Sequence, residues 1–356
     1  MIRSSMPEYI LIDGSQGEGG GQILRTSLAL AALLRQPVQL ENIRANRRQP
    51  GLKTQHLAGV LALARITDAE VKGAYKHSTR LAFAPRAIRG GRYRFEISTA
   101  GAASMLFGAV LPALLFAPQA SEVTITGGTH VAFSPPFHYL EKVFLPTLKR
   151  MGCAVDLELV RWGFYPKGGG EIRAHVKPCR DLQGIRLKQR GALKSLQLSA
   201  CSTPHLPEHI VQREIAQVEK SLIAYSEILK SETLLCRAYS PGNFVFLQAE
   251  YEHAAAGFSG LGKRGKPAED VAEEACRSFR EFEETAATLD SHLADQIILY
   301  TALARGNSFF ITEEATSHLM TNIDIIRKFI TVGIDINSST GLVTVQGTDL
   351  NAEAAT

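Results

Sequence analysis

The chain has 356 residues, of which 45% are hydrophobic and 21% charged, and its formal net charge is +4. This composition is typical of a soluble globular protein large enough for two domains. The modest positive charge argues against a protein that coats duplex DNA, so we expect any nucleic-acid contact to be local, for example at an RNA end. The five cysteines show no metal-ligand spacing and predict free thiols in a reducing compartment.

Hydrophobic segments give no sign of a membrane or export segment. The longest apolar stretch, 105–117, contains Gly108 and Pro112 and is too short to span a bilayer. Residues 1–8 lack the apolar region of a signal peptide. The sequence therefore predicts a cytoplasmic protein with no membrane partner.

Three stretches of the chain predict the same order of helices and strands. The first stretch predicts strand, helix, strand, helix and two strands at 9–12, 23–34, 37–43, 52–66, 69–71 and 80–83. The second predicts the same series at 93–97, 100–116, 122–126, 136–151, 154–160 and 171–176. The third predicts helix, strand, helix and two strands at 293–304, 308–312, 319–330, 333–337 and 342–346. Each unit makes a small sheet with two helices on one face, and only packing of the units together buries their apolar faces.

The stretch between the second and third units breaks this period. It predicts strands at 195–199 and 244–250 and helices at 208–221 and 268–284. We interpret it as a small inserted α/β domain spanning 187–281. The large domain is then formed by 1–186, with units one and two, and by 282–356, with unit three.

A glycine-rich loop at 13–22 joins the first strand to the first helix. In this context backbone N–H groups and the helix dipole can meet an anion. The loop lacks the Walker lysine and the dinucleotide spacing, and taken alone it is equally compatible with a ligand-free turn. Glu18 favours a ligand, because a carboxylate beside a bound phosphate requires a divalent cation such as Mg²⁺ or Mn²⁺ between them.

His318 opens a later predicted helix, far along the chain from this loop. A glycine turn suited to phosphate binding that carries one carboxylate can hold a nucleotide, and a histidine can act as the nucleophile that attacks its phosphate. If the two come together, the chain is a nucleotidyl-transfer enzyme.

Basic and glycine-rich loops supply further candidates. Arg44, Arg47 and Arg48 lie in a strand-to-helix connection where guanidinium groups can bind phosphate, although a solvated basic loop has the same composition. In the inserted stretch, segment 257–266 mixes glycines, cations and one aromatic residue, so Phe258 could stack on a base while Lys263 and Arg264 face phosphate. A flexible surface loop has a similar composition. The glycine triplet in 165–171 favours a hairpin turn.

Several of these strings together resemble the RNA 3′-terminal phosphate cyclase family. They are DGSQGEGGGQILR at 13–25, the Ile43–Arg47 stretch with Pro50-Gly51 and Gln55-His56, GGT at 127–129, GFYPKGGG at 163–170, Gly262–Gly265, LADQ at 293–296 and SHL at 317–319. The strings cover nearly the whole chain in order, and the glycine-loop and GFYPKGGG strings are the most specific.

The resemblance implies an α/β fold with three repeated βαβαββ-like units, related to the enolpyruvyl transferases, and a smaller α/β domain inserted before the third unit. It also implies that ATP and an RNA 3′-phosphate give a 2′,3′-cyclic phosphate, AMP and pyrophosphate. The resemblance further implies that His318 forms a covalent adenylate and that Glu18 binds the metal. The implied ATP- and phosphate-binding residues are Arg25, Arg44, Arg47, Gln55, His56, Pro135, Phe258, Asp295 and Gln296.

Two alternatives come from the same fold. One is a noncatalytic cyclase-like protein of ribosome assembly, which lacks the nucleophilic histidine, whereas His318 is present here. The other is an enolpyruvyl transferase, which needs six repeated units and a longer chain. The chain departs from the family pattern at Gly108, where a glutamine is expected, and at His292, where an aromatic residue is expected. Nucleotide preference, the physiological RNA and homodimer formation stay open at this point.

Overall fold

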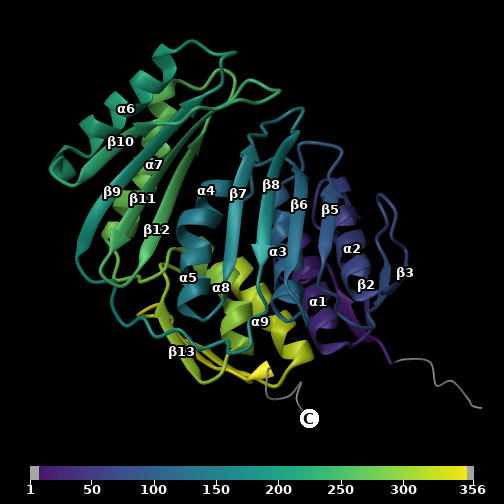
Figure 1. Cartoon of the computed structure of the whole chain (residues 1–356). Helices are drawn as coiled ribbons and strands as arrows, with labels where there is room; N and C mark the ends of the chain where they lie inside the picture. The colour runs from purple at the N-terminus through teal and green to yellow at the C-terminus, as the bar shows by residue number, and fades with distance from the viewer. Residues whose placement is uncertain (1–7, 351–356) are drawn as a thin grey trace, which may run out of the picture.

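The structure is a computed structural model that describes residues 8–350. It contains a large domain of three repeated units and a smaller domain at one side of it (Figure 1). The α/β fold class predicted from the sequence is confirmed. Within the described residues, no helix combines the length and apolar character needed to cross a membrane.

The first unit is a four-stranded sheet covered by two helices. Its elements are β1 (Ile10–Asp13), α1 (Gly21–Leu34), β2 (Val38–Glu41), α2 (Thr54–Thr67), β3 (Glu70–Lys72) and β4 (Leu81–Ala84). The strand order is β1-β2-β4-β3, with β1 parallel to β2 and the other pairs antiparallel. Parallel strands joined through a helix bring the start of α1 and the end of β1 to one edge of the sheet.

The second unit repeats this topology in the order β5-β6-β8-β7. Its elements are β5 (Arg92–Glu96), α3 (Ala103–Leu115), β6 (Ser121–Gly127), α4 (Phe137–Tyr139), η1 (Leu140–Phe144), α5 (Leu145–Arg150), β7 (Val155–Arg161) and β8 (Gly170–Val176). The predicted helix 136–151 is thus one helical run with a π-helical turn in its middle. The predicted hairpin turn is confirmed between β7 and β8, where Gly168 and Gly169 have φ of 64° and 66°.

The third unit contains α8 (Ser291–Leu303), β13 (Asn307–Ile311), α9 (Ser317–Phe329), β14 (Gly333–Ile336) and β15 (Leu342–Gln346), with strand order β13-β15-β14. The segment before the insertion runs beside β13 and forms isolated parallel bridges with the third unit. Leu187 N–H donates to the Phe309 carbonyl (2.8 Å) and Phe309 N–H donates to the Ile185 carbonyl (2.9 Å). The segment before the inserted domain thus lies along β13, and the predicted domain boundaries stay a prediction.

The inserted domain is a four-stranded sheet, ordered β10-β9-β11-β12, with two helices on it. Its elements are β9 (Leu193–Ser202), α6 (His209–Ser221), η2 (Ile223–Tyr225), β10 (Leu229–Thr233), β11 (Asn243–Tyr251), β12 (Ala255–Leu261) and α7 (Ala268–Glu283). The flexible-loop alternative for 257–266 is wrong as far as Leu261, because these residues belong to β12. The glycines that suggested a loop instead allow close packing, because a Cβ on Gly260 would lie 1.9 Å from the Val271 carbonyl oxygen of α7.

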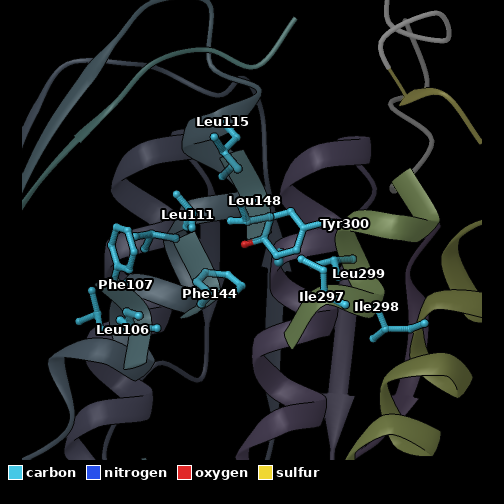
Figure 2. Close-up of a cluster of buried hydrophobic side chains, with 14 of the residues drawn as sticks. Leu106, Phe107, Leu111, Leu115, Phe144, Leu148, Ile297, Ile298, Leu299 and Tyr300 are labelled. Atoms are coloured by element: carbon cyan, nitrogen blue, oxygen red, sulfur yellow. The ribbon is translucent and has the colours of Figure 1, made fainter. Parts of the chain in front are cut away.

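The core of the large domain lies where helices of the units meet. Figure 2 shows Leu106, Phe107, Leu111 and Leu115 of α3 near Phe144, Leu148 and the α8 residues Ile297–Tyr300. The helix α1 also packs against α3 and α9. Because each unit leaves one helical face apolar, burial of these faces against one another holds the three units together.

Candidate active site

A cavity of about 550 Å³ lies between the large domain and the inserted domain. The first two turns of four helices contribute to its lining, with Gln22 and Arg25 from α1, Ser104 and Gly108 from α3, His292 and Asp295 from α8, and His318 and Asn322 from α9. The inserted domain contributes Gly257, Phe258, Ser259 and Ser278. Helix N-termini carry partial positive charge and free N–H groups, so the cavity is suited to an anionic ligand.

The glycine loop before α1 folds its one carboxylate back into the protein. Gly17 and Gly19 have φ of 53° and 58°, in the left-handed region that glycine adopts without steric cost. A Cβ on Gly20 would lie 2.3 Å from the carboxylate of Glu18. Only a glycine at that position leaves room for the Glu18 side chain, which is 6% exposed.

Glu18 lies beside His318, one of the residues that line the cavity. One carboxylate oxygen, Oε1, lies 3.8 Å from His318 Nδ1, and the other, Oε2, pairs with the guanidinium of Arg47. The Glu18 backbone N–H donates to Thr321 Oγ1 (3.2 Å), which docks the glycine loop onto α9. The structure thus brings together the loop and the histidine that the sequence singled out separately.

His318 is held at the start of α9 with its side chain accessible. Thr316 caps this helix by accepting a hydrogen bond from Leu319 N–H (2.9 Å), which fixes the first turn. The His318 side chain is 48% exposed and lines the cavity. A ring held at both a fixed position and a ligand-accessible surface meets the geometric needs of a nucleophile.

A polar network behind His318 joins α1, α8 and α9. Asn322 Oδ1 accepts from Thr26 Oγ1 (2.7 Å) and Gln22 Nε2 (2.9 Å), and Asn322 Nδ2 donates to the Asp295 carbonyl (2.8 Å). Thr316 Oγ1 donates to Asp295 Oδ1 (2.5 Å). Sequence reasoning missed Asn322 and Thr26. Their spacing in the sequence could have identified them. Thr26 follows Gln22 by four residues in α1 and Asn322 follows His318 by four residues in α9, so each pair lies on one face of its helix.

Burial tunes the ionisable groups around this network. It raises the pKa of Asp295 to about 6 and lowers the pKa of Arg25 to about 10, so at neutral pH the first is mostly ionised and the second protonated. Burial, followed by the charges of Arg25, Arg44 and Lys53, lowers the pKa of His56 to about 3. His56 is therefore a neutral ring whose Nδ1 accepts from Lys53 N–H (3.2 Å) at the start of α2.

Gln55 and the three arginines of the basic loop have different surroundings. Gln55 Oε1 accepts from Ala102 N–H (3.2 Å), at the residue that precedes α3. Arg44 is 6% exposed and donates from Nη1 to the carbonyls of Gln49 (2.7 Å) and Gly51 (2.9 Å), so it stabilises the loop backbone. Arg47 and Arg48 are exposed. A phosphate contact for Arg44 stays a prediction.

Four of the residues that the family resemblance implies for ATP binding lie in the wall of the cavity. Pro135, Phe258, Asp295 and Gln296 all line it. The Phe258 ring is 6% exposed and packs against Phe279 and Phe282, with centroids 5.8 and 5.7 Å away. Its main contacts are thus in the core of the inserted domain, and stacking on a base stays a prediction.

The donor set for a metal is a single carboxylate. Within residues 8–350, no group of three or more His, Cys, Asp or Glu side chains is placed to hold a metal ion. Mg²⁺ in nucleotide enzymes commonly uses one or two carboxylates together with substrate phosphates. Glu18 therefore fits a cation shared with a bound nucleotide and does not form a protein-only site.

Comparison with known proteins shows the family of this chain. A family model described as RNA 3′-terminal phosphate cyclase matches residues 16–336. The chain is 44% identical to the RNA 3′-terminal phosphate cyclase of Methylococcus capsulatus, over 94% of this chain and 96% of that protein. It is 43% identical to the protein of the same name from Pyrobaculum neutrophilum, over 91% and 93%. The chain belongs to the RNA 3′-terminal phosphate cyclase family and is an enzyme of the ligase class.

Solved structures of enolpyruvyl transferases give more distant matches. NikO from Streptomyces tendae has a TM-score of 0.28 at 12% identity, covering 95% of this chain and 81% of that one. EPSP synthase from Acinetobacter baumannii has a TM-score of 0.25 at 11% identity, covering 97% and 66%.

Proposed function

We propose that the protein uses ATP to convert an RNA 3′-terminal phosphate into a 2′,3′-cyclic phosphate through a covalent histidine–AMP intermediate on His318. The main support for this proposal is the position of His318 in the cavity wall. It lies there 3.8 Å from the carboxylate of Glu18, and three further helix N-termini line the same cavity. Membership of the cyclase family supports the overall reaction.

The surroundings of His318 suit attack on a phosphorus atom. Its Nδ1 faces Glu18. If the proton of the neutral ring is on Nδ1, Nε2 carries the lone pair that attacks the α-phosphorus. The Nε2–P bond forms, the bond from the α-phosphorus to the bridging oxygen breaks, and pyrophosphate leaves. Arg25, Arg47 and the helix N-termini stabilise the charge that accumulates on the phosphate oxygens.

Two transfers complete the reaction. An oxygen of the RNA 3′-phosphate attacks the adenylate, the phosphorus–nitrogen bond breaks, and His318 is regenerated. The neighbouring 2′-hydroxyl then attacks the activated 3′-phosphate, loses its proton and expels AMP. This last step is intramolecular and needs little beyond correct positioning.

Glu18 is the proposed metal-binding carboxylate. A bound Mg²⁺ or Mn²⁺ supplies Lewis-acid stabilisation of phosphate charge. Glu18 fits this role because its buried carboxylate lies 3.8 Å from Nδ1 of the cavity residue His318, and Arg47 neutralises it in the described structure.

Incubation with ATP labelled at the α-phosphate, without RNA, tests the proposal. We expect label on the protein that acid releases and alkali leaves in place, as for a phosphoramidate. Release of unlabelled pyrophosphate should accompany labelling in equal amounts. A protein that takes up no label with any nucleotide, while still folded, would refute the covalent mechanism and favour the noncatalytic alternative.

A further inference from the structure

Phe133 is an exposed aromatic residue in the wall of the cavity. It lies in the connection between β6 and α4, it lines the cavity together with Gly257 and Phe258 of the inserted domain, and its exposed fraction is 99%. Its backbone φ is 62°, in the left-handed region that bulky residues avoid. Both properties are unfavourable for folding, so packing does not explain a phenylalanine at this position.

The loop that carries Phe133 is fixed at both ends. Phe137 N–H donates to the Thr129 carbonyl (3.1 Å), and Thr129 N–H donates to the Gly163 carbonyl (2.9 Å) of the neighbouring hairpin segment. Inside the loop, Ser134 Oγ donates to the Val131 carbonyl (2.9 Å). Pro135 and Pro136 follow and restrict φ further. The ring of Phe133 is therefore presented on a constrained backbone, which reduces the entropy lost when a ligand stacks on it.

We propose that Phe133 is a base-stacking residue that binds a nucleobase of the substrates through the face of its ring. This inference rests on the proposed function, in which the cavity receives ATP and an RNA end. A fully exposed phenyl ring carries no hydrogen-bonding group, and stacking on a base is the recognition mode open to it among nucleotide contacts. The adenine of ATP and the terminal base of RNA share this chemistry, and the two arms of the experiment below separate them.

The experiment compares Phe133→Gly and Phe133→Trp with the parent enzyme. In the ATP arm, the KM for ATP is measured from covalent labelling without RNA. In the RNA arm, the KM for cyclisation is measured at saturating ATP with two 3′-phosphorylated oligonucleotides, one of normal sequence and one whose terminal nucleotide lacks its base. We expect Phe133→Gly to raise the KM in one arm on the order of 5- to 150-fold, and Phe133→Trp to retain most of the affinity.

The abasic oligonucleotide assigns the source of the base. If Phe133 stacks on RNA, the abasic end weakens binding to the parent but not to Phe133→Gly, and the ATP arm is unchanged. If Phe133 stacks on adenine, only the ATP arm changes. Either result supports the proposal. An unchanged KM in both arms overturns it.

Thermal unfolding distinguishes stacking from a structural role. Glycine relieves the left-handed φ, so we expect Phe133→Gly to unfold at the same temperature as the parent or a higher one. A lower unfolding temperature that Phe133→Trp does not restore would indicate a packing role and overturn the proposal. Tyr75→Gly is the matched control, because Tyr75 is 65% exposed and does not line the cavity. Covalent labelling of the parent enzyme by ATP is required in these assays. If the parent takes up no label, the proposed function fails, and this outcome is distinct from a failure of the stacking role of Phe133.

Discussion

The second helices of the three repeated units each carry a histidine in their first turn, and the three histidines have different surroundings. His56 in α2 and His138 in α4 are 8% and 5% exposed, whereas the side chain of His318 in α9 is 48% exposed. His56 lies among the cations Arg25, Arg44 and Lys53, while His318 lies beside the carboxylate of Glu18. Equivalent positions in a repeat thus have different access to ligand.

His138 shows most clearly what a structural histidine looks like in this fold. Its Nδ1 lies 2.9 Å from His130 Nε2, and its ring packs near Trp162 and Phe244. Burial lowers the pKa of His138 to about 3, so the ring stays neutral. The comparison shows that the repeat supplies a histidine position at a helix N-terminus. Packing then decides whether that histidine stabilises the fold or meets a ligand.

The largest expected effect comes from removing the imidazole of His318. We expect His318→Asn to lower covalent labelling by ATP roughly a thousandfold or more, because the nucleophile is removed, with the unfolding temperature unchanged. His138→Asn is the matched control. It should label at nearly the parent rate per folded molecule but lose stability. Equal labelling of His318→Asn and parent would remove the assignment of the nucleophile.

The carboxylate beside His318 gives the second prediction. At limiting Mg²⁺, Glu18→Ala should label roughly a hundredfold more slowly, because a metal ion contributes several kcal/mol of charge stabilisation. Glu41→Ala serves as control, since Glu41 is a β2 carboxylate that pairs with Arg80, whereas Glu18 pairs with Arg47 and lies beside His318. Titration of both variants with Mg²⁺ checks the effect, and superimposable curves would argue against metal binding by Glu18.

Arg47 gives a smaller effect at the same carboxylate. Charge-assisted hydrogen bonds contribute about 1.5 to 3 kcal/mol, so Arg47→Ala should lower the efficiency of labelling about tenfold or more. The control is Arg48→Ala, which removes the neighbouring exposed arginine and leaves the Arg47–Glu18 pair in place. Labelling kinetics of the two variants, with thermal unfolding as a check, tests whether Arg47 acts on phosphate. Similar rates for both would indicate only a solvated basic loop.

The buried histidines predict a moderate loss of stability in acid. The pKa of His138 is about 3 in the folded protein and near its ordinary value of 6.5 when unfolded, so the unfolded state binds more protons between these values. The stabilisation is complete above pH 6.5 and falls by up to about 1.4 kcal/mol per pH unit below it. Urea unfolding at pH 7.5 and 5 should show a smaller loss for His138→Asn than for the parent. An identical loss of stability in both proteins would show that His138 is not the source of the acid destabilisation.

The sequence was sufficient to predict the repeats because their periodicity is local. Apolar spacing identified the helices and strands of the three units, and the glycine loop carrying Glu18 was recognised from its strand–turn–helix context. Local patterns failed at β12, where glycines suggested a loop. There the deciding contact is between Gly260 and Val271 of α7, a contact with another element that no local pattern records.

The sequence by itself determined the residue types of the site, with Glu18 in a glycine turn and His318 at a helix start. Only the tertiary structure decided which histidine meets the cavity, that Arg44 is buried on loop carbonyls, and that Asn322 joins α1 to α8. It also placed the segment before the inserted domain against β13 of the third unit. The physical reason is that exposure, charge environment and pairing between units depend on residues hundreds of positions apart. Those residues become neighbours only when the apolar faces of the units are buried together.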